Sequence, residues 1–274
     1  MEPTSPNPSI AQSAVARLHA DGSAQTLTDD VVIEEPLEIR LGNAPFVVTM
    51  RTPGHDEELA AGFLVTEGIA RSASDFKTID RCPLSVTPEN TVRVRFNASV
   101  ETDRIDSNRF GAVSSSCGVC GKTSIESIRK AYPEIDSACT VDRQVLLSLP
   151  DKLRQRQAVF ERTGGLHSSG LFDSAGNLIC LREDVGRHNA LDKAIGYAVL
   201  NDRMPLDDCV LMVSGRVSFE IIQKALAARI PVVAAVSAPS SLAISFARDC
   251  GQTLIGFLRH PKMNVYSHPH RIRD

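Results

Sequence analysis

The second half of the chain alternates apolar, strand-like runs with helical segments, and this alternation constrains the fold more than any other feature. Helices are predicted at residues 187–200, 219–228 and 241–248, and strands at residues 209–213, 232–236 and 253–258. Short strands that alternate with helices of about ten residues form crossover units, which place neighbouring strands in parallel. We therefore expect an α/β fold with a largely parallel sheet that helices cover on both faces.

A helix and a hairpin precede this alternation. Residues 142–161 are predicted to be helical with an interruption at Pro150, and residues 166–172 and 178–181 flank a Ser-Ala-Gly-Asn turn that is typical of a hairpin. The order of helix, hairpin and alternating strands and helices resembles the cytidine-deaminase fold. We therefore predict a cytidine-deaminase-like αβα domain over residues 123–266.

The first half of the chain predicts a smaller domain of mixed structure. Strands are expected at residues 31–34, 37–41, 46–51 and 91–96, and a helix at residues 55–69. These elements predict a small α+β domain over residues 31–113. The polar segment at residues 1–30 is predicted to be a mobile tail, and residues 267–274 a solvated tail.

A glycine- and serine-rich loop with two cysteines joins the predicted domains at residues 114–122. Its sequence is Ser-Ser-Ser-Cys-Gly-Val-Cys-Gly-Lys, and a Thr-Ser-Ile-Glu capping box directly after it predicts the start of a helix. The helix dipole and the nearby Lys122 favour the thiolate forms of Cys117 and Cys120. We therefore predict a reactive cysteine loop with a nucleophilic thiol.

Other interpretations of the cysteine pair stay open from the residues alone. A buried structural pair would need apolar neighbours, which this loop lacks. A structural zinc site needs about four ligands, and the chain has no second C-x-x-C, since Cys82 and Cys139 are single. A thioredoxin-like redox pair follows a βαβ unit, whereas the preceding half predicts a different mixed sheet. A thiol that receives and passes on a group fits the loop, but the pair by itself does not decide.

Three loops at predicted strand ends carry residues that suit anions. These loops lie at residues 183–189 (EDVGRHN), 214–218 (SGRVS) and 237–241 (SAPSS). In parallel sheets, ligands bind beyond the carboxyl ends of the strands, where helix N-termini attract phosphate. Ser214, Gly215, Arg216 and Arg187 offer a hydroxyl donor, close backbone approach and guanidinium groups. Each loop by itself is also explained by helix capping, but the three together favour a phosphorylated ligand.

No metal site is predicted, although the fold resembles that of zinc enzymes. In zinc deaminases a glutamate stands two residues after the histidine that opens the helix, and a P-C-x-x-C segment opens the next helix. Here Ala190 stands two residues after His188, and residues 214–218 contain no cysteine. We therefore expect a deaminase-like scaffold whose side chains hold no metal ion.

Charge and composition exclude further classes of function. The chain has 30 basic and 33 acidic residues and a formal net charge of -3, so it offers no general attraction for nucleic acid or an anionic membrane. The N-terminal segment lacks the basic start and apolar run of a secretory signal. We expect a cytoplasmic protein with reduced thiols and no membrane contact, in which Cys180, Cys209 and Cys250 are core residues.

Five blocks of sequence together resemble one protein family. The blocks lie at residues 115–121 (SSCGVCG), 163–167 (TGGLH), 182–193 (REDVGRHNALDK), 214–216 (SGR) and 256–259 (GFLR). In this order they resemble the formate dehydrogenase accessory sulfurtransferases, the FdhD/NarQ family. The resemblance extends over residues 31–266.

The resemblance implies a specific chemistry. Members of the family take sulfur as a cysteine persulfide from a cysteine desulfurase, pass it to the molybdenum cofactor in its bis(molybdopterin guanine dinucleotide) form, and so activate formate dehydrogenase. The persulfide cysteine of the family falls on Cys117, and Cys120 is a helper or alternate acceptor. The cofactor-binding stretch of the family falls on Phe257, Leu258, Arg259, His260, Pro261 and Lys262.

The strand-end loops agree with this chemistry. A cofactor with two guanine dinucleotide arms needs several phosphate sites, which Arg187, Arg216 and Arg259 would supply. Two similar arms also suit a homodimer with one arm per subunit. Two other functions stay open, namely a thiol-disulfide oxidoreductase that uses Cys117 and Cys120, and a cofactor-binding chaperone without thiol chemistry. Only sulfur transfer uses both the cysteine pair and the phosphate loops.

Overall fold

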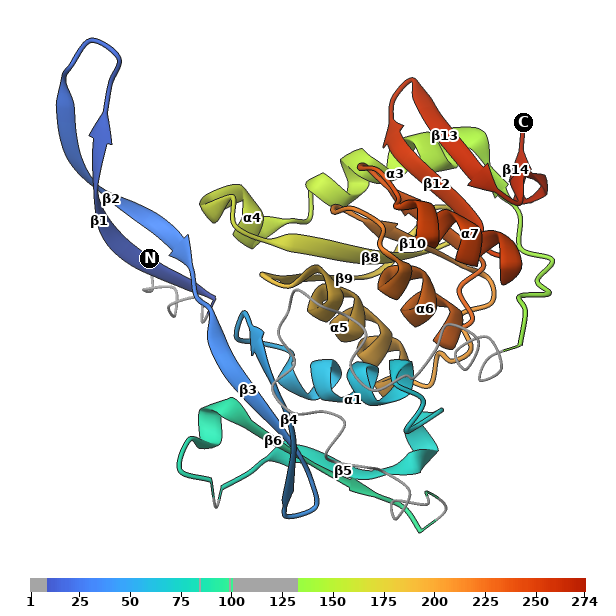
Figure 1. The fold of residues 1–274 in the computed structure, drawn as a ribbon, viewed down its shortest axis with the longest axis horizontal. Coiled ribbons are helices and arrows are strands. Elements are labelled where there is room, and N and C mark those ends of the chain that lie inside the picture. Colours follow the sequence, from blue (N-terminus) through green and yellow to red (C-terminus); the bar gives the residue numbers. More distant parts are fainter. Residues whose placement is uncertain (1–8, 84, 99, 101–132) are drawn as a thin grey trace.

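The computed structural model describes residues 9–83, 85–98, 100 and 133–274 as a two-stranded arm, a smaller N-terminal unit and a larger C-terminal unit (Figure 1). The arm consists of β1 (Ile10–Leu18) and β2 (Ala24–Val32). The N-terminal unit consists of β3 (Glu35–Leu41), β4 (Ala44–Arg51), α1 (Asp56–Thr66), β5 (Phe76–Arg81) and β6 (Thr91–Phe96). The C-terminal unit consists of β7 (Val141–Asp142), α3 (Arg143–Arg154), α4 (Ala158–Thr163), β8 (His167–Asp173), β9 (Leu178–Asp184), α5 (Arg187–Leu200), β10 (Cys209–Val213), α6 (Phe219–Ala227), β11 (Val232–Ala235), α7 (Ser241–Asp249), β12 (Thr253–Arg259), β13 (Lys262–Ser267) and β14 (Ile272–Arg273).

The arm stands where the sequence predicted a mobile tail. β1 and β2 pair antiparallel along their whole lengths and extend away from the rest of the molecule in Figure 1. The carboxylate of Asp21 closes the turn by accepting hydrogen bonds from the backbone N–H and the hydroxyl of Ser23. The tail prediction is wrong for residues 10–30 because backbone pairing holds this exposed ribbon, and pairing of that kind leaves no apolar pattern in the sequence.

The N-terminal unit is a four-stranded sheet with one helix packed on it. The strand order is β4-β3-β6-β5; β3 and β6 are parallel, and the outer pairs are antiparallel. Leu37, Ile39, Val92 and Val94 alternate along the two central strands and are buried in one cluster with the apolar side chains of α1. The predicted small α+β arrangement is therefore present.

The C-terminal unit is built on a six-stranded sheet of order β13-β12-β11-β10-β8-β9. β10, β11 and β12 are parallel, whereas β8, β9 and β13 pair antiparallel with their neighbours. The predicted α/β class is confirmed. The prediction of a largely parallel sheet is correct only at the centre, because β8–β9 and β12–β13 are hairpins.

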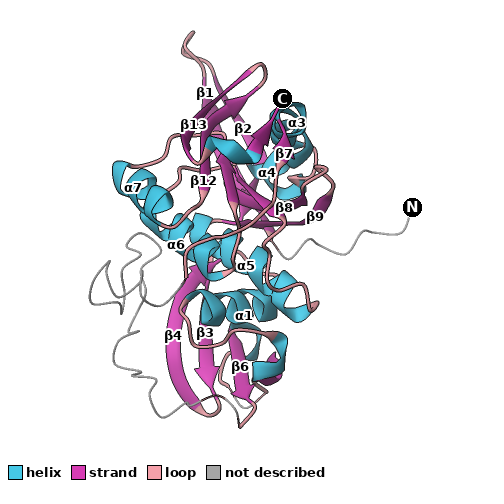
Figure 2. Ribbon diagram, turned by 90° about the vertical axis from the view of Figure 1, so that its right-hand side faces the viewer, coloured by secondary structure: helices cyan, strands magenta, loops and turns pink. Residues whose placement is uncertain are grey.

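Helices cover both faces of this sheet, as expected. Figure 2 shows α5, α6 and α7 apart from α3. Leu211, Val213 and Val233 pack in the hydrophobic cluster of α5, α6 and α7, while the alternating Val210 and Met212 pack in that of α3. The two hydrophobic clusters thus follow the period of two along the strands. None of the described helices is long and apolar enough to cross a membrane.

The two units are joined where α1 packs on α5 (Figures 1 and 2). A Cβ atom at Gly62 of α1 would lie 1.8 Å from the carbonyl oxygen of Asp192, and one at Gly196 of α5 would lie 1.8 Å from the carbonyl oxygen of Glu58. The backbones of the two helices are therefore in contact at both positions. This close crossing fixes the N-terminal unit against the C-terminal unit.

The helix α3 continues through Pro150, where the sequence predicted an interruption. It ends at Arg154, and the chain then turns before α4 begins at Ala158. Proline in a helix interior costs roughly 3 kcal/mol. Leu146 and Leu153, which lie on either side of the proline and are buried against the sheet, hold the helix together.

The C-terminal residues are part of the core structure, and the predicted solvated tail is wrong. β14 pairs with β7, and the guanidinium group of Arg271, which is only 3% exposed, donates hydrogen bonds to the carbonyl oxygens of Gly251 (2.7 Å) and Ile135 (3.4 Å). The guanidinium satisfies loop carbonyls that would otherwise be unpaired. The basic sequence of residues 267–274 therefore suggests exposure to solvent, although the side chain of Arg271 is buried.

Candidate functional site

The candidate site lies at the edge of the six-stranded sheet where β10, β11 and β12 end. Because β8 is antiparallel to β10, the first residues of β8 reach the same edge, and His167 pairs there with Asp184 at the end of β9. The helices α5, α6 and α7 begin directly after β9, β10 and β11. Three helix N-termini therefore gather at this edge, as the positions of the predicted anion loops require.

Backbone hydrogen bonds join the loops that follow these strands. The N–H of Val217 donates to the carbonyl oxygen of Ala238 (3.2 Å), and the N–H of Ser240 donates to that of Val217 (2.9 Å). The N–H of Phe257 in turn donates to the carbonyl oxygen of Ser237 (3.1 Å). The loops after β10, β11 and β12 thus form one continuous surface.

The structure brings Ser214, Gly215 and Arg187 together at this edge. Ser214 and Ser168 exchange two hydrogen bonds of 2.9 and 3.0 Å, which fix the loop to the start of β8. A Cβ atom at Gly215 would lie 3.2 Å from Nδ1 of His167 and 3.8 Å from Cδ of Arg187. Glycine therefore allows the imidazole and the guanidinium stem to pack directly against the loop.

The local electrostatic potential at this edge is positive. Burial lowers the pKa of His167, and the charges of Arg187 and Arg216 lower it further, against the opposing charge of Asp184. The imidazole is therefore neutral at neutral pH, between two permanent cations. An anion bound here would meet guanidinium groups and helix N-termini of the same sign.

Three buried donors at this edge have no hydrogen-bond partner among the described residues. They are the hydroxyl groups of Ser168 and Ser169, which are 2% and 1% exposed, and Nε of Arg187. Buried polar groups are nearly always paired in native proteins. Unpaired donors beside Gly215 thus point to a bound ligand or bound water.

A cavity of about 540 Å³ opens beside these donors, between the sheet edge and the α3–α4 segment. His167 and Ser214 line it on the sheet side, and Gln157 and Phe160 line it on the helical side. The guanidinium group of Arg154 lies 4.6 Å from the centre of the Phe160 ring. An aromatic face, a buried amide and a cation give this cavity the chemistry of a site for a planar polar group.

The predicted cofactor stretch at residues 257–262 divides into two parts. Phe257 joins the loop surface, with a left-handed φ of 50°, but the side chain of Leu258 is fully buried in the core on the α3 face. Arg259, His260, Pro261 and Lys262 form the exposed β12–β13 turn. Pro261 and Lys262 line a different hollow of about 340 Å³, which α3 also lines. The structure therefore does not gather this stretch around Arg187.

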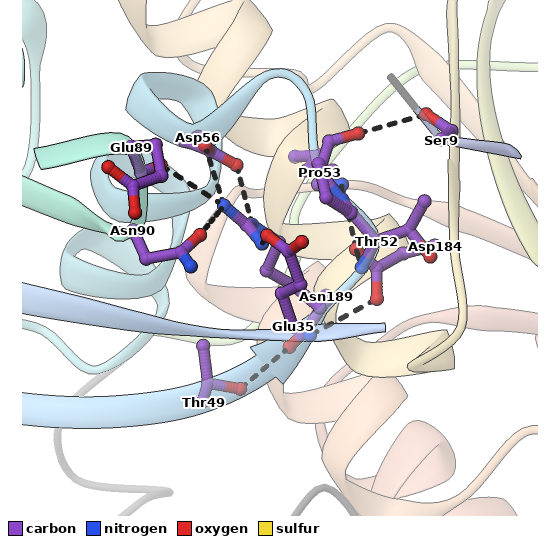
Figure 3. Close-up of polar contacts among 12 residues, drawn as sticks. Ser9, Glu35, Thr49, Thr52, Pro53, Asp56, Glu89, Asn90, Asp184 and Asn189 are labelled. Carbon is purple, nitrogen blue, oxygen red and sulfur yellow. Dashed lines mark hydrogen bonds and ion pairs between the residues drawn. The ribbon is translucent and has the colours of Figure 1, made fainter. Parts of the chain in front are cut away.

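Several residues of the block at residues 182–193 hold the fold together rather than facing the site. The carboxylate of Asp184 is 0% exposed; it pairs with Nζ of Lys193 at 2.7 Å and accepts a hydrogen bond from the N–H of Thr52. The amide of Asn189 donates to the carbonyl oxygen of Met50. Figure 3 shows Asp184 beside Thr52 and Asn189 beside Thr49, which are contacts between the two units.

Two residues that sequence analysis did not connect complete the site. Nε2 of His188 lies 3.0 Å from Oε2 of Glu220 and 3.3 Å from the hydroxyl of Ser218. These residues begin α5 and α6 and are nearly buried. The only signal in the sequence was an acidic residue in the first turn of a predicted helix, which is more commonly a response to the helix dipole.

The structure describes the cysteines of the two units but not the two cysteines of the predicted loop. Cys117 and Cys120 lie outside the described residues, so the predicted cysteine loop stays a prediction. Cys180, Cys209 and Cys250 are buried in the core, as predicted. Burial raises the pKa of Cys180 to about 12 and raises that of Cys209 as well, which disfavours their thiolates.

Potential metal ligands do not cluster in the described part of the chain. No group of three or more His, Cys, Asp or Glu side chains there has the arrangement of a metal site. His188, at the position of a deaminase zinc ligand, faces Glu220 and Ser218 instead.

Comparisons with known proteins agree on one family. The model of the FdhD/NarQ family matches residues 32–273. A protein of Streptomyces avermitilis named "Sulfur carrier protein FdhD" is 51% identical over 259 residues, which is 92% of each chain. A protein of Mycobacterium tuberculosis with the same name is 47% identical over 272 residues, covering 96% of this chain and 98% of that one.

A solved structure has the same fold. It is the crystal structure of a protein from Desulfotalea psychrophila described as a formate dehydrogenase accessory protein, which superposes with a TM-score of 0.78 over 97% of this chain and 100% of that chain at 24% identity. The family model and the relatives at about half identity both extend over nearly the whole length of the protein. The chain therefore belongs to the FdhD/NarQ family.

Proposed function

We propose that this protein is a sulfur carrier that accepts a persulfide on Cys117 and delivers its sulfur to the molybdenum cofactor in the bis(molybdopterin guanine dinucleotide) form, for use by formate dehydrogenase. The observation that carries the proposal is the family match over residues 32–273, together with relatives named sulfur carrier proteins. The donor is a cysteine desulfurase and the sulfur is carried in the cytoplasm, where thiols stay reduced.

The loading step is an exchange between two sulfur atoms. The thiolate of Cys117 attacks the terminal sulfur of the desulfurase persulfide, a new S–S bond forms to Cys117, and the desulfurase cysteine leaves as a thiolate. The exchange needs no external oxidant or reductant. A low thiol pKa on a glycine-rich loop before a helix favours the attacking thiolate, as the sequence of residues 114–122 suggests.

The acceptor is held through its phosphate groups. Arg187, Arg216 and the helix N-termini at the sheet edge supply charge for one guanine dinucleotide arm, and the unpaired hydroxyls of Ser168 and Ser169 supply further donors. The cavity that Gln157 and Phe160 line is large enough for a flat ring system beside these phosphates. A homodimer with one arm in each subunit accounts for a cofactor with two arms.

The scaffold also fits this proposal. The order β9-β8-β10-β11-β12, with a helix after each of β9, β10 and β11, is the order expected of a cytidine-deaminase-like domain. In such a domain the zinc site lies at the start of the helices that correspond to α5 and α6. We propose that this family uses the same place to hold an acceptor without a metal ligand set.

Intact-mass analysis after incubation with a cysteine desulfurase and cysteine tests the loading step. We expect one added sulfur, about 32 Da, on the peptide that contains Cys117, because a persulfide forms on the most reactive thiolate. Cys180→Ala is the matched control, since the pKa of this buried thiol is raised, and it should keep the full adduct.

The same measurement separates the rival functions. Retention of the adduct in Cys117→Ala would remove Cys117 from the proposal. A Cys117–Cys120 disulfide without any persulfide would favour a thiol-disulfide oxidoreductase. No sulfur adduct in any variant, together with tight binding of the cofactor, would favour a chaperone without thiol chemistry.

A further inference from the structure

The β1–β2 arm is attached to the rest of the described chain at its base. The hydroxyl of Ser9 donates a hydrogen bond to the carbonyl oxygen of Pro53 at 2.9 Å, and Arg162 of α4 pairs with Asp30 at 2.8 Å. Within the described part of the chain, the hydrogen bonds of residues 11–29 stay inside the arm. The outer part of the arm therefore projects from the molecule as a two-stranded ribbon (Figure 1).

A ribbon of two strands needs a further surface to be stable. An isolated two-stranded hairpin is marginally stable at best in water, and a third strand or a packed face is needed to hold it. The arm also exposes apolar side chains, since Leu18 at the end of β1 is 77% exposed and Val31 is 37% exposed. We therefore expect the outer part of the arm to pack against another surface.

The β13 edge of the six-stranded sheet offers such a surface. β13 is the last strand of this sheet, and its strand partner among the described residues is β12. Exposed edge strands are usually covered or blocked in native proteins. Beside β13, the hollow of about 340 Å³ opens against α3 and is large enough for a leucine side chain. Most of its lining is apolar and includes Leu147, Met263, Val265 and Ile272.

The arm and the β13 edge carry opposite charges. Residues 18–35 hold five acidic side chains and no Lys or Arg, whereas residues 250–273 hold four Lys or Arg side chains and no Asp or Glu. The cations Arg143 and Lys262 line the hollow itself. Opposite potentials of this kind steer association and fix the orientation of the partners. An acidic ribbon with an exposed leucine therefore complements a basic edge with an apolar hollow.

The arm does not reach the β13 edge of its own chain. In Figure 1 the arm extends from one side of the molecule, and β13 lies at the other side with α3 and α4 between them. The contact with α4 fixes the base of the arm in this place. Each strand of the arm has nine residues, which span roughly 30 Å. This length lets the arm extend onto a neighbouring molecule.

We propose that the arm of a second copy of this chain docks along β13, with its Leu18 in the hollow between α3 and β13 and its carboxylates near Arg143 and Lys262. Exchange of two arms gives a closed two-fold dimer, in which each copy supplies one arm and one edge. The inference rests on the proposed function for the presence of a homodimer, and it assigns the interface. Because α4 carries the base of the arm and also lines the candidate cavity, the contact adjoins the site.

Light scattering on the full-length protein tests the interface with two variants. Leu18→Asp places a charge in the apolar hollow, and Lys262→Glu reverses a charge beside it. Each should weaken the dimer by about tenfold or more, and the wild-type dimer should weaken as salt is added. Both side chains are exposed in the single chain, so both variants should keep the wild-type circular dichroism spectrum.

Two matched controls make the same chemical changes elsewhere. Val48→Asp and Lys77→Glu alter exposed side chains of the N-terminal unit and should leave the dimer intact. A monomeric wild-type protein at micromolar concentration would overturn the proposal. A dimer that Leu18→Asp and Lys262→Glu leave as tight as the wild type would overturn it as well.

Photo-cross-linking identifies what the arm contacts. Protein with benzoylphenylalanine in place of Leu18 is mixed with ¹⁵N-labelled wild-type protein, and the cross-linked peptides are sequenced by mass spectrometry. We expect links between labelled and unlabelled chains, at residues of α3 or β13. Links that stay within one chain, or that join two chains at another surface, would contradict the docking site.

Persulfide loading of the same samples separates this inference from sulfur carriage. A monomeric wild type that still gains sulfur on Cys117 would overturn the arm interface and leave the proposed chemistry intact. A wild-type dimer with the expected cross-links that gains no sulfur would support the interface and refute the proposed chemistry.

Discussion

At the scale of single residues, the site is defined by cations without a carboxylate partner. Among the described residues, neither Arg187 nor Arg216 forms an ion pair, whereas Arg51 contacts Asp56, Glu35 and Asn90 in the N-terminal unit. A guanidinium group that is paired with carboxylates in this way stabilises the fold. Arg187 and Arg216 are not paired in this way, so their guanidinium groups are available to an anionic ligand at the sheet edge.

The first prediction concerns these arginines. Replacing Arg216 with alanine should weaken GDP binding by about tenfold to a hundredfold, because a charge-assisted hydrogen bond is lost. Arg187→Ala should have a similar effect, and Arg71→Ala, which removes an exposed arginine in the N-terminal unit, should have none. Calorimetry with GDP measures all three. Equal affinity in the three variants and the wild type would place the nucleotide elsewhere.

At the scale of elements, the crossing of α1 and α5 depends on two glycines. Their Cα atoms face the backbone of the other helix, so the distance between the helix axes is set by the absence of side chains. The hydrophobic cluster shared by the two units forms around this crossing. A helix–helix contact of this kind determines where an entire unit sits.

The second prediction tests this crossing by adding one methyl group. Gly62→Ala and Gly196→Ala should each destabilise the protein by about 3 kcal/mol or more, because overpacking against backbone leaves no room for adjustment. Gly42→Ala is the control, since Gly42 has a φ of 59° but no atom within 4 Å of an added Cβ. It should cost only about 1–2 kcal/mol of backbone strain. Denaturant unfolding measures the difference, and equal losses would contradict the close crossing.

At the scale of the whole molecule, buried polar contacts join the two units into one body. Lys193 of the C-terminal unit donates to the carbonyl oxygen of Thr52 in the N-terminal unit at 2.7 Å and pairs with Asp184. Arg182 of the C-terminal unit also pairs with Glu58 of α1, and both side chains are mostly buried. These contacts therefore hold the two units together.

The third prediction compares a buried ion pair with an exposed one. Lys193→Met should destabilise the protein by about 3–5 kcal/mol, because Asp184 is left buried without its cation. Arg162→Met breaks the exposed pair with Asp30 and should cost about 0–1 kcal/mol. Adding Asp184→Asn to Lys193→Met should recover part of the loss. If the two single variants unfold at the same denaturant concentration, the buried Lys193–Asp184 pair stabilises the protein no more than the exposed pair does.

The sequence by itself determined the C-terminal secondary structure and the family. The strand at Cys209–Val213 and the helix at Arg187–Leu200 agree with their predicted bounds, because local periodicity and turn residues specify such elements. The alternation of strands with helices also predicts parallel strands. The loops that follow these strands could therefore be placed at one edge of the sheet. The arm was missed, since an exposed hairpin held by backbone bonds has no apolar period.

Only the tertiary structure decided which polar residues stabilise the fold and which face the candidate site. In the block at residues 182–193, Asp184 and Lys193 differ from Arg187 and His188 in burial and partners, which no local pattern specifies. The contact between His188 and Glu220 likewise arises from the packing of two helices on a shared sheet. Contacts between residues far apart in the chain depend on the folded arrangement of elements, whereas helices and strands depend mainly on their own sequence.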